Sequence, residues 1–118
     1  MARELRLTAS IHSTGTALST VRKAVSKFVT QAAAGFSTNS GVVPTSSEAL
    51  SIGSVTTEGW LYIKNMSQIG TAILDNGSAD SVELRPGDVA LFRLDHTKTV
   101  NVDAGGVKPL LEWLVIED

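Results

Sequence analysis

Apolar and polar residues alternate near the start of the chain. From Leu5 to Ile11 the odd-numbered residues are apolar and the even-numbered residues are polar. A period of two is typical of a β-strand that buries one face. The pattern therefore predicts a strand over residues 5–11, with residues 1–4 as an N-terminal arm. The Ser, Thr and Gly residues at 13–16 predict the turn that follows.

The segment from residue 17 to residue 34 has two readings. Its apolar residues at 17, 21, 24, 25, 28, 29 and 32 have the spacing of one face of an amphipathic helix. The segment is also rich in Val, Ser and Thr, and β-branched residues pack well on sheets but lose side-chain freedom in helices. The residues alone leave helix and strand open.

Short apolar runs separated by turn residues fill the second half of the chain. The predicted strands are 59–65, 69–74, 81–84, 89–94, 99–103 and 110–117. Asn76-Gly77 favours a tight hairpin, and Arg85-Pro86-Gly87-Asp88 favours a type II turn, which needs a positive φ at its glycine. We expect the Ser-, Thr- and Gly-rich stretch at 35–57 to be loop and short strand.

The run from Leu110 to Glu117 is apolar on both faces. This predicts either a central strand of a sandwich or a surface that a neighbouring subunit covers. Together the patterns predict eight or nine short strands with closely spaced turns, which is typical of an all-β sandwich or barrel. We expect one antiparallel sandwich domain over residues 1–118.

The composition narrows the possible partners. With no Cys the chain has no disulfide and no thiolate metal site, and with few aromatic residues its core must be mainly aliphatic. The formal net charge of −2 gives no overall field that attracts nucleic acid or an anionic membrane. The N-terminus shows neither a signal peptide nor a membrane-spanning run. We therefore expect neither nucleic acid nor a membrane as partner.

Residues suited to catalysis are few and scattered. His12 and His96 have no second His or Cys at metal-ligand spacing. Asp95 adjoins His96, but no Gly-x-Ser-x-Gly elbow positions a serine nucleophile. Asp75 and Asp80 flank a turn that lacks the acidic density of a calcium loop. We expect no catalytic, cofactor or metal site, and hence no enzyme.

The remaining charged residues have simpler readings. The carboxylates of Asp88, Asp95 and Asp103 lie at predicted strand ends and are expected to serve turns. Arg22, Lys23 and Lys27 form the basic cluster, and without interleaved aromatics they make a poor nucleic-acid platform. They are expected to solubilise one face of their segment or to pair with acidic residues of a partner.

Residues 46–118 resemble small virion proteins of tailed bacteriophages. The similar stretches are 47–55, 57–65, 84–94 and 111–118, which include Gly59-Trp60-Leu61-Tyr62-Ile63-Lys64-Asn65 and Leu84-Arg85-Pro86-Gly87-Asp88. This resemblance implies a jelly-roll-like sandwich, and it also implies that residues 17–34 form a long strand paired with the first. The chain departs from the pattern at Met66-Ser67-Gln68-Ile69, where an Asp- and Asn-rich run is more typical, so the shape of this loop is left open.

The same resemblance implies a role in a virion. We expect a capsid decoration or cement subunit, made in the host cytoplasm, that forms a homo-oligomer, with a trimer favoured, and binds the major capsid protein. The candidate contact residues are Leu5, Leu7, Phe28, Trp60 and Trp113, although both tryptophans can also be read as core. The alternatives are a tail, connector or baseplate component and, in another class, a carbohydrate-binding module.

Overall fold

The computed structural model describes residues 4–12, 22–30, 35–75, 81–95, 97–104 and 106–117. Within these residues every regular element is a β-strand, and the paired strands are antiparallel. The predicted all-β class is confirmed. The described residues form ten strands, not the eight or nine expected, and they include no helix able to cross a membrane.

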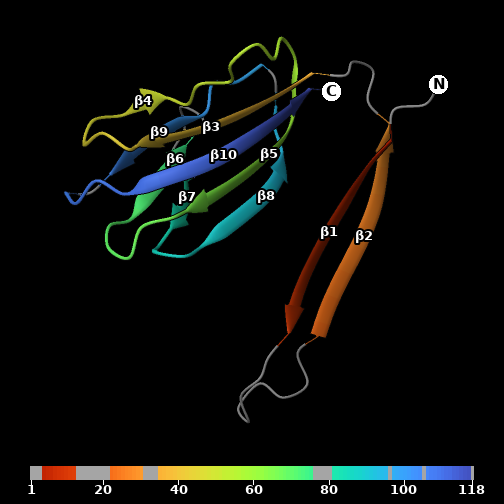
Figure 1. Ribbon diagram of the computed structural model, residues 1–118, viewed down its shortest axis with the longest axis horizontal. Coiled ribbons are helices and arrows are strands. Elements are labelled where there is room, and N and C mark those ends of the chain that lie inside the picture. Colours follow the sequence, from red (N-terminus) through yellow and green to blue (C-terminus); the bar gives the residue numbers. More distant parts are fainter. Residues whose placement is uncertain are drawn as a thin grey trace. The chain divides into compact units, whose positions relative to one another are not determined.

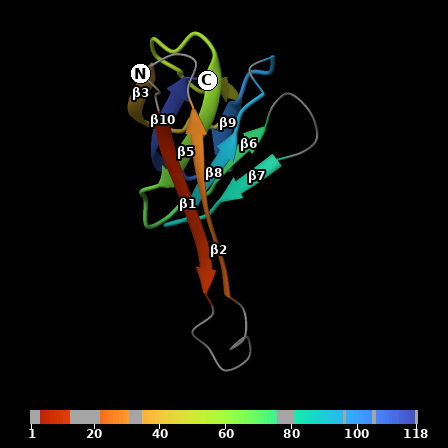
Figure 2. The ribbon, with the colours of Figure 1, turned by 90° about the vertical axis from the view of Figure 1, so that its right-hand side faces the viewer.

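The chain divides into two compact units, Met1–Ala34 and Gly35–Asp118. The first contains β1 (Glu4–His12) and β2 (Arg22–Thr30), which pair along their whole length as a two-stranded sheet (Figures 1 and 2). We expected residues 1–118 to form one sandwich, whereas β1 and β2 pair with each other in a sheet of their own. β1 begins at Glu4, within the expected N-terminal arm, and residues 1–3 lie outside the described residues.

The ambiguous segment is a strand over residues 22–30, so the helical reading is wrong there. Pairing with β1 runs from Glu4 opposite Thr30 to His12 opposite Arg22. Backbone pairing over nine residues overrides the helical spacing of the apolar side chains, since local propensity is a weak preference. The rest of the 17–34 segment and the expected turn at 13–16 lie outside the described residues.

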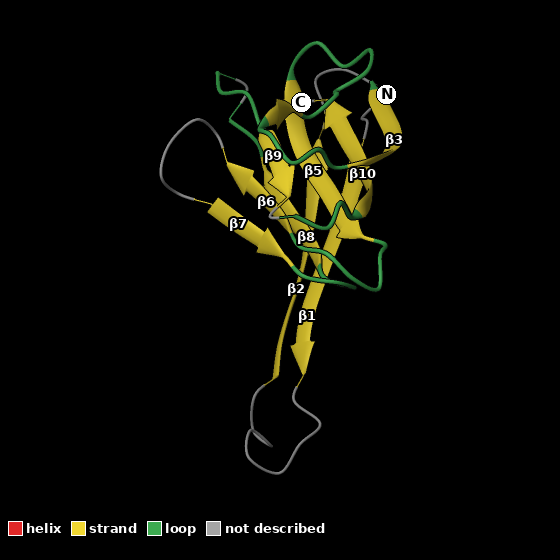
Figure 3. Ribbon diagram, turned by 90° about the vertical axis from the view of Figure 1, so that its left-hand side faces the viewer, coloured by secondary structure: helices red, strands yellow, loops and turns green. Residues whose placement is uncertain are grey.

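The second unit is a sandwich of two four-stranded sheets. Its strands are β3 (Phe36–Val42), β4 (Glu48–Ala49), β5 (Glu58–Asn65), β6 (Ala72–Asp75), β7 (Ser81–Leu84), β8 (Val89–Arg93), β9 (Asn101–Ala104) and β10 (Leu110–Glu117). The first sheet has the order β3-β10-β5-β8 and the second the order β4-β9-β6-β7. Figure 3 shows the strands in yellow and the loops that connect them in green. β10 is therefore a central strand, as its two apolar faces predicted.

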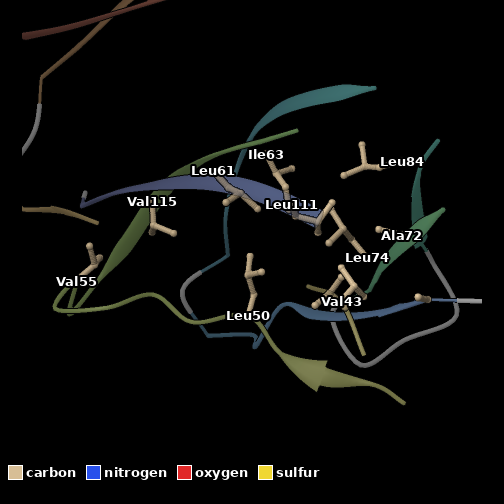
Figure 4. Packing of buried hydrophobic residues seen from close by; sticks show 12 residues of the cluster. Val43, Leu50, Val55, Leu61, Ile63, Ala72, Leu74, Leu84, Leu111 and Val115 are labelled. Carbon is tan, nitrogen blue, oxygen red and sulfur yellow. The ribbon is translucent and has the colours of Figure 1, made fainter. Parts of the chain in front are cut away.

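The core lies between the two sheets. Leu61 and Ile63 of β5 and Leu111 and Val115 of β10 are fully buried, and they face residues of the second sheet such as Leu74 (Figure 4). Burial alternates strictly along β5, with every second side chain inside. Burying such aliphatic side chains stabilises the fold by roughly 2 kcal/mol each.

The turn before β8 has the predicted type II geometry. Gly87 has φ of 83°, and the backbone N–H of Asp88 donates to the carbonyl of Arg85 at 2.9 Å. The Asp88 carboxylate also accepts from the backbone N–H of Arg85 at 3.0 Å. Asp88 is thus a turn residue, as expected.

The loop between β5 and β6 is organised by a buried amide. Asn65 is fully buried, and its Nδ2 donates at 3.0 Å to the carbonyls of both Gly70 and Leu84. Its Oδ1 accepts from the backbone N–H of Ser67 at 3.0 Å. The strand predicted over 69–74 starts only at Ala72, because Gly70 with φ of 92° cannot belong to an extended strand.

Candidate interaction surfaces

One face of the β1–β2 hairpin combines apolar side chains with lysines. The register places Leu7 opposite Lys27, Ala9 opposite Val25 and Ile11 opposite Lys23, and residues directly opposite each other in an antiparallel pair share a face. We call these six residues the lysine face. The side chains of Ile11 and Val25 are 67% and 63% exposed.

The other face of the hairpin is more polar and carries one aromatic ring. The Arg6 Nε donates to the Ser26 hydroxyl at 3.1 Å, and its guanidinium lies 5.8 Å from the centre of the Phe28 ring. Phe28 remains 65% exposed despite this contact. Thr8 and Ser10 lie on the same face and are also exposed.

A two-stranded ribbon has no second layer in which to bury either face. Isolated hairpins are marginally stable in water, and further strands or a packing partner are needed for independent stability. The exposed apolar side chains on the lysine face therefore form a surface suited to a packing partner. Leu7 and Phe28, two of the candidate contact residues, lie in this hairpin, on opposite faces. Leu5 lies in β1 opposite Val29, and its side chain is outside the described part.

The sandwich has a second apolar surface on the outer face of its first sheet. The pairings align the residues that point away from the core in rows across the four strands. The exposed or half-buried apolar and aromatic members of this outer face are Phe36, Val42, Trp60, Tyr62, Val89, Leu91, Leu110 and Leu114, whereas Ile116 on the same side is buried. An antiparallel sheet that faces water normally has a polar outer side, so this composition is unusual for a solvated surface.

The outer face of the second sheet shows the usual pattern. Asp75 and Asn101 lie opposite each other, as do Ile73 and Asp103, and Glu83 pairs with Ile73 from the other side. These positions are mainly polar or acidic. The two outer surfaces of the sandwich therefore differ, and the apolar one belongs to the first sheet.

A shallow groove of about 410 Å³ runs over the outer face of the first sheet. Its lining includes Tyr62 and Leu114, the hydroxyls of Thr38 and Ser40, and the carboxylate of Glu112. Glu112 lies directly opposite Lys64. Within the described residues the two side chains form no ion pair.

The two predicted tryptophans lie on opposite sides of the first sheet. Trp113 is on the inner side, packs against the core, and its Nε1 donates to the Ser51 carbonyl at 2.8 Å. Trp60 is on the outer face, where the Arg93 guanidinium lies 5.7 Å from its ring centre. Its Nε1 is buried and has no hydrogen-bond partner among the residues that the structure describes. Trp113 thus takes part in core packing, whereas Trp60 is placed on the candidate surface.

The titratable residues serve local structure. Arg85 and Glu83 form an exposed ion pair at 2.7 Å, and this hydrogen bond with its charge attraction raises the pKa of the arginine. The Asp95 carboxylate accepts from the backbone N–H and the hydroxyl of Thr97 at 2.9 and 2.6 Å. Neither arrangement forms a catalytic centre.

The possible metal-ligating side chains of the described residues lie apart from one another. Among them no three His, Cys, Asp or Glu side chains gather closely enough to hold a metal ion. Asp103 lies within β9 rather than in a turn. His96, Asp80 and the side chain of His12 lie outside the described part.

The division of charge between the two units is a signal that the sequence analysis missed. Residues 1–34 contain five basic and one acidic residue, a net charge of +4, whereas residues 35–118 contain five basic and eleven acidic residues, a net charge of −6. The total of −2 hides this asymmetry. The signal was readable from the sequence, but only a known boundary between residues 34 and 35 makes the two sums meaningful.

Comparisons with known proteins add no relative. No protein-family model matches the chain, and no curated protein or solved structure matches it. The resemblance to phage virion proteins stays a prediction, and the evidence on function comes from the surfaces of the protein itself.

Proposed function

We propose that this protein is a non-enzymatic structural subunit of a tailed-bacteriophage particle, a capsid decoration or cement protein that stabilises the head. The observation that carries the proposal is the hairpin, whose apolar lysine face has no layer of its own to cover it. A protein with such an unburied element is suited to assembly with other subunits.

The sandwich topology supports the same proposal. When its strands are numbered from β3, the sheet orders are 1-8-3-6 and 2-7-4-5. We propose that this is a jelly roll, an eight-stranded, two-sheet architecture that also occurs in viral capsid domains. The topology alone does not assign a function, so it supports the proposal through its agreement with the exposed surfaces.

In this role the protein acts through many weak contacts. Apolar area that is removed from water at each contact contributes about 25 cal/mol per Å² before the cost of association is subtracted. Copies that bridge neighbouring capsomers, as a trimer at a local three-fold position would, add their contacts together. The shell then resists disruption even though each contact is modest.

The test uses particles of the phage that carries this reading frame. We expect mass spectrometry of purified particles to detect the protein in many copies and electron cryomicroscopy to place it on the outside of the head. Particles from which the reading frame is deleted should release their DNA at a lower temperature. A protein absent from the particles would overturn the proposal, and one found only in the tail would replace it with a tail or baseplate role.

A carbohydrate-binding module is the second candidate, because of the groove that Tyr62 lines together with hydroxyl and carboxylate groups. Sugars bind where an aromatic ring lies beside polar side chains. A glycan array in which binding depends on Tyr62, and is lost in Tyr62→Ala, would favour this candidate. An array without hits removes it.

A further inference from the structure

We infer that copies of this chain associate by arm exchange: the lysine face of the hairpin of one copy packs on the outer face of the first sheet of a second copy. This inference deepens the proposed function, on which it rests, by naming the surfaces that join one subunit to another.

The first step is the match of apolar surfaces. The lysine face presents Ile11 and Val25, both exposed, beside the partly buried Leu7. The outer face of the first sheet presents Tyr62 and Leu114 on adjacent strands. Sheets pack face to face at about 10 Å when both facing surfaces are apolar, so the two surfaces are suited to each other.

The second step is the match of charge. The hairpin unit carries +4 and the sandwich unit −6, so a hairpin is attracted to the sandwich of another copy. At the contact itself, exposed Lys23 and Lys27 lie among the apolar residues of the hairpin. The Glu112 carboxylate lies in the groove of the receiving face.

Charge alone would favour a different docking surface. The outer face of the second sheet carries Asp75, Asp103 and Glu83 but has little apolar area. Burial of Ile11 and Val25 requires an apolar counterpart, which the first sheet has and the second lacks. The outer face of the first sheet, with the Glu112 carboxylate among apolar side chains, is therefore the better docking surface for the hairpin.

The third step is the size of the contact. A nine-residue strand is about 30 Å long and two strands are about 10 Å wide, so one face covers about 300 Å² on each partner. One such contact buries about 600 Å² in total, which is below the range of about 1,200 to 2,000 Å² for stable interfaces. Two reciprocal contacts between the same two copies reach about 1,200 Å², and in a ring of three each copy is held by two contacts, also about 1,200 Å² in total. Exchange must therefore be reciprocal or cyclic.

The test is sedimentation velocity and light scattering on the full chain over a concentration series. We expect the wild type to self-associate and Lys27→Glu to weaken the association constant about tenfold or more, because like charges then face each other. Glu112→Lys should weaken it similarly. In a reciprocal pair, a mixture of the two variants should associate at least about tenfold more tightly than either alone, since each hairpin then faces an opposite charge. In a ring of three one contact keeps like charges, so the mixture should restore association only in part.

Two matched controls separate this contact from general charge effects. Thr8→Glu with Ser10→Glu changes the net charge by the same two units as Lys27→Glu but lies on the opposite face of the hairpin. Asp103→Lys changes the charge of the sandwich by the same amount as Glu112→Lys but lies on the second sheet. Both controls should weaken association much less than Lys27→Glu and Glu112→Lys, because they change the net charge of a unit but not the contact itself.

Three outcomes would overturn the inference. The first is a wild type that stays monomeric up to about 100 µM, roughly the weak limit for a contact of this size. The second is loss of association in the controls but not in Lys27→Glu and Glu112→Lys. The third is a monomer whose lysine face binds a duplex DNA probe, with that binding lost in Lys27→Glu.

Failure of arm exchange and failure of the proposed virion role give different results. Self-association through the two surfaces, in a protein absent from phage particles, would leave arm exchange standing without the virion role. A monomer that is nevertheless found on the capsid surface would overturn arm exchange and leave the decoration role standing.

Discussion

Asn65 shows how one polar side chain fixes a loop from inside the sandwich. Its amide is fully buried and bonds to the backbone of three different residues, Ser67, Gly70 and Leu84. Its own backbone N–H donates to the Asp88 carbonyl, and its carbonyl accepts from the Gly87 N–H. Asn65 therefore holds the loop after β5 through its side chain and the type II turn before β8 through its backbone.

We expect Asn65→Ala to lower the free energy of unfolding by about 3 kcal/mol. The substitution leaves the buried Leu84 carbonyl, the half-buried Gly70 carbonyl and the Ser67 N–H without their side-chain partner, and each costs about 1 to 3 kcal/mol when water does not replace it. Urea denaturation measures the change. Asn101→Ala is the matched control, because Asn101 makes one long side-chain bond to Asp75 at 3.5 Å and should cost less than about 1 kcal/mol. Equal losses in both variants would contradict the role of Asn65.

The two tryptophans offer a second comparison of single residues. We expect Trp113→Phe to destabilise the protein by about 1 kcal/mol more than Trp60→Phe, because Trp113 loses its bond to the Ser51 carbonyl and Trp60 has none to lose. Both replacements remove the same ring atoms, so the difference between their chemical denaturation curves reports the Trp113 hydrogen bond together with the different packing of the two rings. The reverse order would place Trp60 rather than Trp113 in the packing that holds the sandwich together.

The two hairpin strands have fewer paired neighbours and less buried contact than the central strands of the sandwich. β5 and β10 have a paired strand on both sides and a core beneath them, whereas β1 and β2 have one paired neighbour each in a two-stranded sheet. Local stability follows burial and pairing, so the hairpin should open more easily than the sandwich.

We therefore expect amide hydrogens of β1 and β2 to exchange faster with solvent than those of β5 and β10 when the protein is dilute. Raising the protein concentration should slow exchange in the hairpin and leave β5 and β10 unchanged, because association covers the hairpin. Hydrogen exchange followed by mass spectrometry measures both. A hairpin as protected as β10 at the lowest concentration would contradict this expectation.

The elements that could be predicted from the sequence are those whose apolar residues face the core. β5 and β10 were predictable as apolar runs bounded by turn residues, and Leu61, Ile63, Leu111 and Val115 of these runs point inward. β3 was left within a stretch of loop and short strand because its inward positions are small or polar. A Cβ at Gly41 would lie 3.5 Å from the Trp113 ring, so the bulk that fills this part of the interior comes from the neighbouring strand.

At the scale of the whole molecule, the chain joins a basic unit to an acidic one. The residues of the candidate surfaces could be predicted from the sequence only in part. The exposed position of Phe28 followed from its place in the first unit, but the receiving face combines residues from four strands that are far apart in the sequence. A local sequence pattern does not predict which strands become neighbours in a sheet, and so it does not predict which of their residues lie side by side.

The charge asymmetry makes a prediction about salt. We expect self-association to weaken about tenfold between about 0.1 M and 1 M NaCl, because the screening length falls from about 10 Å to about 3 Å. The apolar part of the contact should leave some association at high salt. Analytical ultracentrifugation at several salt concentrations measures the effect, and Lys27→Glu should respond less. Association that strengthens with salt throughout would indicate a purely apolar contact.

The position of β10 has a consequence for how the protein folds as it is made. It lies between β3 and β5 in the first sheet, yet it is translated after every other described strand. Until it emerges from the ribosome, β3 and β5 have no strand between them and the apolar interior stays open. Nascent chains at this stage should therefore be prone to aggregation and dependent on chaperones, and the sandwich should close in a single late step.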